Sequence, residues 1–200
     1  MRLHATLFAV GALTAAVASG QPWPDKNTAT PDLVQTGFGP NGAFLPFDGS
    51  AYCGPTTAAM ALGYLNAAGF TQLIGPSPGD AEYLNLVRLL SGLGGASDSG
   101  GTLASSLMEG IGVLMDAKGI NPSQRSIPSG NGGFRQTIGD IQSQNVDQHI
   151  LFGALGWYQN DNGYYTRSGG HFFVITDQVV GAPGTLTIHN PFPNSLLDQP

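Results

Sequence analysis

The chain has 200 residues, of which only 10% are charged and 30 are glycine. Globular proteins carry about 25% charged residues and about 7% glycine, so this composition favours a core-rich fold with glycine-punctuated loops. The net charge of −6 and the lack of a basic patch argue against nucleic acid as a partner. The single cysteine cannot form an internal disulfide, so packing must stabilise the fold.

The N-terminus has the pattern of a secretory signal peptide. A charged start precedes an apolar run over 5–18, which is shorter than the about 20 residues of a membrane-spanning helix. Cleavage fits after Ala18 or Gly20, so we expect a signal peptide at 1–20 and a single domain at 21–200. Neither a lipid-anchor cysteine nor an apolar tail follows. We therefore expect a secreted or periplasmic monomer without a membrane anchor.

Helical patterns precede strand patterns along the chain. The region before residue 50 is rich in turns, with at most a short strand at 32–36. Apolar periodicity predicts helices at 55–68, 80–91, 102–118 and, more briefly, 137–144. Strands are predicted at 150–158, 164–167, 171–176 and 185–189, with a hairpin turn at 160–163. This order predicts an α+β domain with N-terminal helices packed on a C-terminal antiparallel sheet.

Cys53 precedes the first of these helices. Gly54 permits a sharp turn, and Pro55 suits the first helical position because it lacks an N–H group. A helix N-terminus stabilises a thiolate, so we expect a lowered thiol pKa and a candidate nucleophile at Cys53. The alternative is a small buried apolar residue, which is the ordinary role of a free cysteine.

A cysteine nucleophile needs a base, and two histidines compete for that role. His171 begins a predicted buried strand after two glycines, which allow close approach of the backbone. His189 is the rival, but it alternates with Asn190 along a strand, so the two should face opposite sides. Asn190 can accept a hydrogen bond from Nδ1–H of His171 and orient the ring, or it can simply initiate the Asn-Pro turn.

We expect no metal and no cofactor. The sequence has no pair of cysteines or histidines at ligand spacing, and the polar turn at 160–163 lacks the later ligands of a calcium loop.

Three motifs resemble the C39-like branch of papain-type cysteine peptidases. They are Cys53-Gly54-Pro55-Thr56, Gly169-Gly170-His171 and Asn190-Pro191, and the resemblance covers roughly 35–193. Gly156-Trp157-Tyr158 before a hairpin, followed by Arg167, is similar to exported bacterial members of that branch. The resemblance implies a papain-like fold with Cys53 as nucleophile, His171 as base and Asn190 as orienting residue. The family commonly has Asp at the third position, and the papain group has Asn.

One departure from the family concerns the oxyanion donor. Members typically carry a Gln about six residues before the cysteine, where this chain has Phe47. Gln35 can take the role if the intervening chain loops out; Ser50 and the backbone N–H groups at Cys53 are alternatives. The resemblance implies an exported thiol hydrolase acting on a peptide or protein substrate. An acyl or amide transferase with the same residues and a catalytically silent binding module are the alternatives.

Overall fold

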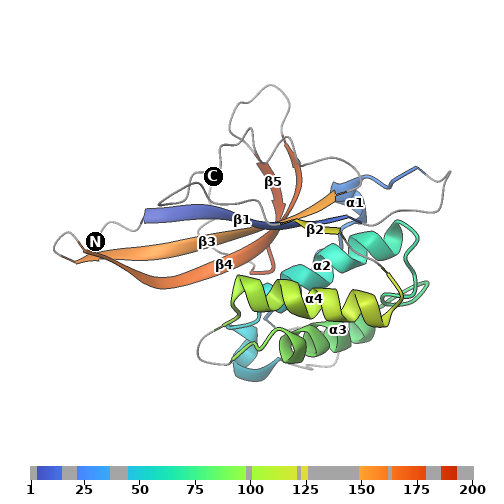
Figure 1. Cartoon of the computed structure of the whole chain (residues 1–200), viewed down its shortest axis with the longest axis horizontal. Helices are drawn as coiled ribbons and strands as arrows, with labels where there is room; N and C mark the ends of the chain where they lie inside the picture. Colours follow the sequence, from blue (N-terminus) through green and yellow to red (C-terminus); the bar gives the residue numbers. More distant parts are fainter. Residues whose placement is uncertain are drawn as a thin grey trace.

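The long helices of this computed structural model lie together on one side of an antiparallel sheet (Figure 1). The structure describes residues 4–14, 22–36, 45–97, 101–120, 123–125, 149–161, 164–178 and 186–192. Within these ranges the helices precede most of the strands and pack against them, which confirms the α+β class.

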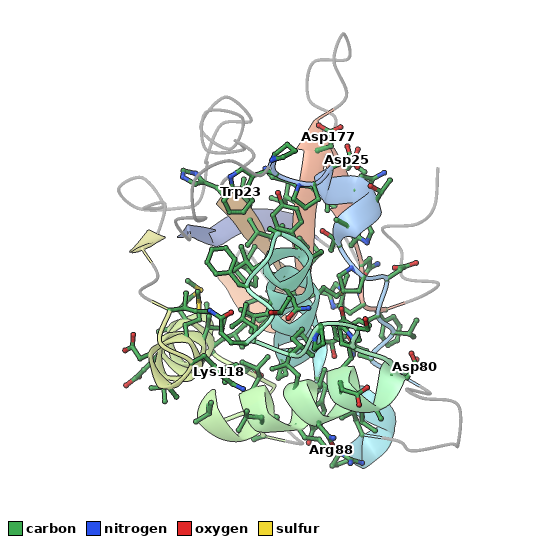
Figure 2. All side chains as sticks on the ribbon, turned by 90° about the vertical axis from the view of Figure 1, so that its right-hand side faces the viewer. Trp23, Asp25, Asp80, Arg88, Lys118 and Asp177 are labelled. Atoms are coloured by element: carbon green, nitrogen blue, oxygen red, sulfur yellow. The ribbon has the colours of Figure 1, made fainter. Side chains whose placement is uncertain are left out.

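The helix that begins at Cys53 is the centre of the helical layer. The described helices are α1 (Lys26–Ala29), the 3-10 helix η1 (Pro46–Gly49), α2 (Cys53–Ala67), α3 (Asp80–Leu93) and α4 (Ala104–Ala117). Every residue of α2 from Cys53 to Asn66 is buried, because α3, α4, β3 and β4 all contact it. Figure 2 shows α2 enclosed by these elements. A helix that is apolar all round is expected to be buried in this way.

Glycines in the left-handed region end two of the long helices. Gly69 and Gly119 adopt positive φ angles of 112° and 69° just after α2 and α4, a conformation that favours glycine. At the start of α3 the N-cap is Gly79, whose backbone N–H donates to Oε2 of Glu82 at 2.9 Å. The helix predicted at 102–118 starts two residues later, at Ala104, and its N-cap is Leu103.

The sheet has the strand order β2-β1-β3-β4-β5, and every pairing is antiparallel. The strands are β1 (His4–Thr14), β2 (Ser123–Arg125), β3 (His149–Asp161), β4 (Tyr164–Gln178) and β5 (Leu186–His189). The predicted hairpin is confirmed, since Asp161 pairs with Tyr164 across the turn. The strands predicted at 164–167 and 171–176 form one strand, β4, whose pairing with β3 continues on both sides of a register shift between Trp157 and Tyr158.

The N-terminal apolar run has a place in this sheet. β1 pairs with β3 from His4↔Tyr158 to Thr14↔His149, so it overlaps the segment predicted as the apolar part of a signal peptide.

Two shorter predicted elements, the strand at 32–36 and the helix at 137–144, are not found among the described residues. Residues 32–36 form no strand but an irregular segment, since their hydrogen bonds go to loops. The helix predicted at 137–144 lies outside the described residues.

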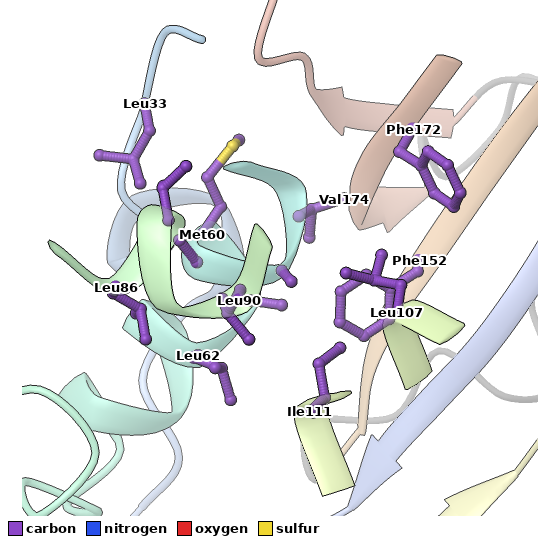
Figure 3. Close-up of a cluster of buried hydrophobic side chains, with 14 of the residues drawn as sticks. Leu33, Met60, Leu62, Leu86, Leu90, Leu107, Ile111, Phe152, Phe172 and Val174 are labelled. Atoms are coloured by element: carbon purple, nitrogen blue, oxygen red, sulfur yellow. The ribbon is translucent and has the colours of Figure 1, made fainter. Parts of the chain in front are cut away.

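The core lies between the helices and one face of the sheet (Figure 3). Alternate residues of the strands supply the sheet side, because successive strand side chains point to opposite faces. From the strands the core takes Ile150, Phe152, Ala154, Phe172 and Val174; from the helices it takes, among others, Met60, Leu62, Leu90, Leu107 and Ile111. This packing places the N-terminus of α2 against β4.

Candidate active site

Cys53 is the first residue of α2, as the sequence predicts for a helix N-terminus. The turn before it is closed by a hydrogen bond from Tyr52 N–H to the Gly49 carbonyl, at 2.9 Å. Its side chain is 8% exposed, and the backbone N–H groups of Phe172 and Gly54 and its own N–H donate toward the sulfur. The contact with Phe172 joins the start of α2 to the middle of β4.

Burial raises the pKa of the Cys53 thiol, and the backbone hydrogen bonds from Phe172 and Gly54 offset this only in part. The prediction of a lowered thiol pKa is therefore wrong for the resting protein. The helix N-terminus favours the thiolate, but removing the thiol from water disfavours it more strongly. The resting side chain is a neutral thiol at neutral pH.

Gly54 has a different role from the predicted sharp turn. It is the second residue of α2, and its φ angle is not positive. A Cβ atom at this position would lie 3.1 Å from Cβ of Thr102 and 3.4 Å from Cδ2 of Leu107. Glycine suits this position because a side chain would have to displace Thr102 and Leu107, at the start of α4, by a few tenths of an ångström.

His171 lies on β4 directly before Phe172, the residue whose backbone contacts the sulfur of Cys53. It pairs with Leu155 of β3 and is 6% exposed. Its Nε2 atom lies 2.6 Å from Oδ1 of Asn190, which follows the last residue of β5. The fold thus brings a cysteine, a histidine and an asparagine from three distant parts of the sequence into one neighbourhood.

The Asn190 side chain determines which ring nitrogen of His171 carries the proton. Its Oδ1 atom also accepts the backbone N–H of Phe192 at 3.0 Å. A backbone N–H can only donate, so this bond fixes which end of the amide is the oxygen. Nε2 of His171 is therefore the donor in the 2.6 Å bond, and in the neutral ring Nδ1 holds the lone pair. The predicted bond through Nδ1–H is wrong, because Nε2 of His171, rather than Nδ1, faces Oδ1 of Asn190.

His189, the rival base, has other neighbours. Its Nε2 atom lies 3.2 Å from Oδ1 of Asn27 in α1, and its Nδ1 atom lies 3.9 Å from a carboxylate oxygen of Asp32. The next residue, Asn190, contacts His171 instead. Consecutive residues at the end of β5 thus reach different partners, as strand alternation predicts.

Gln35 reaches the loop that precedes Cys53, although not as an available donor. It is 1% exposed, and its Nε2 atom donates to the carbonyls of Gly49 at 2.8 Å and Ser50 at 3.3 Å. An amide nitrogen has two protons, and both are directed at these carbonyls. In this arrangement the amide has no proton left for a substrate oxyanion. Ser50 itself is exposed.

Phe192 is a site residue that the sequence analysis did not identify. Its ring meets the ring of His171 edge-on, with centroids 6.3 Å apart and an interplanar angle of 78°, and the side chain is 37% exposed. An aromatic residue two positions after a proposed orienting Asn was the available signal. The ring covers part of the imidazole and remains accessible from outside.

The described part of the chain contains no group of three or more His, Cys, Asp or Glu side chains arranged to share a metal ion. None of the described helices has the length and apolar character needed to cross a bilayer. Comparisons with models of known protein families, with curated proteins and with solved structures found no match.

Proposed function

We propose that the chain is a thiol hydrolase of papain-like fold that cleaves peptide or amide bonds. In this proposal Cys53 is the nucleophile, His171 is the general base and acid, and Asn190 orients the imidazole. One observation carries it: the 2.6 Å hydrogen bond from His171 to Asn190 is made next to the strand residue, Phe172, that contacts the sulfur. The C39-like resemblance of the three motifs supports the same assignment.

Acylation begins from the neutral thiol. Nδ1 of His171 takes the proton of Cys53 as the sulfur attacks the substrate carbonyl carbon, so a C–S bond forms and the carbonyl oxygen becomes an oxyanion. The imidazolium then gives this proton to the amide nitrogen, the C–N bond breaks and the amine leaves. A thioester to Cys53 remains. In this proposal the bond from Nε2–H to Asn190 leaves Nδ1 as the nitrogen that accepts and returns the proton in both steps.

Deacylation reverses the roles of the two residues. A water molecule gives a proton to Nδ1 of His171 while its oxygen attacks the thioester carbon. The C–S bond breaks, the acid product leaves and the proton returns to the sulfur of Cys53. An amine in place of water gives acyl transfer with the same residues.

The oxyanion requires donors other than Gln35 in its present position. The first turn of α2 supplies the backbone N–H groups of Cys53 and Gly54, which have no helical partner and are directed toward the sulfur in the resting protein, next to where the oxyanion would form. Such preorganised donors stabilise the charge that develops on the carbonyl oxygen. We assign the oxyanion site to this turn.

A catalytically silent binding module is the second candidate. The buried position of Cys53 and its raised thiol pKa favour it, because both properties are typical of a structural cysteine. The hydrogen bond between His171 and Asn190 favours the enzyme, since it is made next to Phe172, whose backbone contacts the sulfur, and a structural cysteine does not require it.

We also propose that the protein is exported and acts in a secreted or periplasmic setting after loss of residues 1–20. The substrate is then a peptide or protein in that compartment, and the enzyme works as a monomer without a cofactor. The charge pattern over 21–200 still predicts no nucleic-acid partner.

The test compares two histidine variants on a mixture of fluorogenic peptides. We expect His171→Ala to lower kcat/KM by about 10²–10⁴-fold, which is the usual contribution of a positioned acid–base group. His189→Ala is the matched control, since it removes a histidine at the opposite side of β5, and it should keep its activity. Cys53→Ala should abolish turnover. Hydrolysis that persists in Cys53→Ala, or that falls equally in both histidine variants, would reject the proposal.

A further inference from the structure

Gln35 joins two segments that carry proposed catalytic residues. Its backbone N–H donates to the Pro191 carbonyl at 2.7 Å, directly after Asn190. Its side chain donates to the carbonyls of Gly49 and Ser50, shortly before Cys53. One buried residue therefore holds both the loop of the nucleophile and the segment of the orienting Asn.

The backbones of Gln35 and Gly49 are in close contact. Gly49 has a φ angle of 74°, and a Cβ atom there would lie 1.8 Å from the backbone carbonyl oxygen of Gln35. The two backbones touch without space for a side chain. The Gly49 carbonyl also accepts Tyr52 N–H at 2.9 Å, and Tyr52 is the N-cap of α2. The link thus continues from Gln35 to the first turn of the helix that begins with Cys53.

The side-chain oxygen of Gln35 indicates that the hydrogen bonds of the side-chain nitrogen set the orientation of the amide. Oε1 of Gln35 is buried and has no hydrogen-bond partner among the described residues. A buried acceptor without a partner is unfavourable, so the amide holds this orientation because of the two bonds made by Nε2. Turning it over would direct Oε1 at two carbonyl oxygens and lose both bonds.

We propose that Gln35 is a positioning residue that sets the spacing between Cys53 and the His171–Asn190 pair, rather than the donor to the oxyanion. This role rests on the proposed thiol hydrolase function and deepens it. The reason is geometric: a displacement of about 1 Å in a reacting pair can cost about 10²-fold in rate. Gln35 limits such displacement because it is bonded to both sides of the pair.

Alkylation of Cys53 by iodoacetamide separates the two roles. Alkylation needs loss of the thiol proton, which His171 accepts in the proposed mechanism, but it forms no oxyanion. Gln35→Met keeps the size of the side chain and removes its donors. We expect it to slow alkylation of the native protein at pH 8 by about tenfold, within the range of a small misplacement. The matched control is Gln72→Met, which changes an exposed glutamine in the loop after α2 and should leave the rate unchanged.

A double-mutant cycle with His171→Ala identifies the path of the effect. If Gln35 acts through the pairing of His171 with Cys53, its substitution should add little to the loss already present in His171→Ala. Fully additive losses would overturn the proposal. So would normal alkylation with slowed peptide hydrolysis, which would return Gln35 to the oxyanion site. Because alkylation needs no substrate, the result stands apart from any failure to find hydrolysis.

Gln35→Glu provides a rescue with a pH signature. A protonated Glu can donate to the Gly49 carbonyl, whereas a carboxylate repels it. The alkylation rate of this variant relative to wild type should approach one at low pH and fall as the new carboxyl group ionises. A ratio that does not change with pH, in protein whose circular dichroism shows that it is folded, would contradict the role. This variant decides the question if Gln35→Met does not fold.

Discussion

Cys53 is subject to two opposing influences, and their balance decides its chemistry. The N-terminus of α2 and the N–H of Phe172 stabilise a thiolate, while burial destabilises it and dominates. A neutral resting thiol makes the proposed mechanism depend on His171 as a base at the moment of attack. An enzyme with a preformed ion pair would instead hold its thiolate before substrate arrives.

The raised pKa of the Cys53 thiol has a measurable effect on stability. Between the unfolded value of about 8.5 and the higher folded value, the unfolded chain releases a proton that the folded protein keeps. The free energy of unfolding should therefore fall as pH rises above about 8.5. Urea denaturation at several pH values measures this, and Cys53→Ala should remove that part of the pH dependence.

A matched control lies at Tyr83, whose pKa is also raised by burial. The part of the free energy of unfolding that comes from the protonated Tyr83 side chain should be lost only at higher pH, above the ordinary tyrosine pKa of about 10. Tyr83→Phe should therefore leave the loss of stability above pH 8.5 unchanged. A pH dependence that is unchanged in Cys53→Ala would mean that the buried thiol does not titrate as the structure indicates.

At the scale of the elements, α2 is the helix on which both the fold and the proposed site depend. Its glycines are needed for close packing rather than for flexibility. A Cβ atom at Gly63 would lie 2.5 Å from Cγ of Pro31 and 3.0 Å from the hydroxyl of Tyr83. The segment that contains Pro31 continues to Gln35, so the packing of α2 against it also holds the proposed positioning residue.

Two glycine substitutions test this view of α2. Gly63→Ala should destabilise the protein, because the overlap with Pro31 outweighs the gain of up to about 1 kcal/mol in helix propensity. Gly92→Ala in α3 meets no atom within 4 Å, so it should stabilise the protein by up to that amount. Thermal denaturation measures both. Equal shifts of Tm for the two variants would show that α2 has more room than the structure indicates.

At the scale of the whole molecule, β1 matters for the proposed export because it overlaps the predicted signal peptide. Residues 4–14, which include much of the apolar run that predicts a signal peptide, form a strand between β2 and β3. We interpret β1 as a feature of the full 200-residue chain, and we propose that its removal on export leaves the β1-facing edge of β3 open. The contacts among α2, β4 and β5 that build the proposed site do not involve β1.

This interpretation leads to an expected result on export. Expression in a bacterial secretion host should yield a protein whose N-terminal sequence starts after Ala18 or Gly20. A chain of residues 21–200 should show the helical circular dichroism of the full chain and keep its His171-dependent alkylation. If the exported protein retains 4–14, or if the shorter chain is unfolded, β1 is an integral strand and the signal peptide proposal is wrong.

The sequence by itself determined the α+β class, the three long helices and the hairpin between β3 and β4, because these depend on local periodicity and turn chemistry. It also nominated Cys53, His171 and Asn190 through their local motifs. Only the tertiary structure decided the ring orientation of His171, the direction of the Cys53 pKa and the bonds of Gln35. Those properties depend on burial and on partners distant in the sequence, and local patterns carry no information about either.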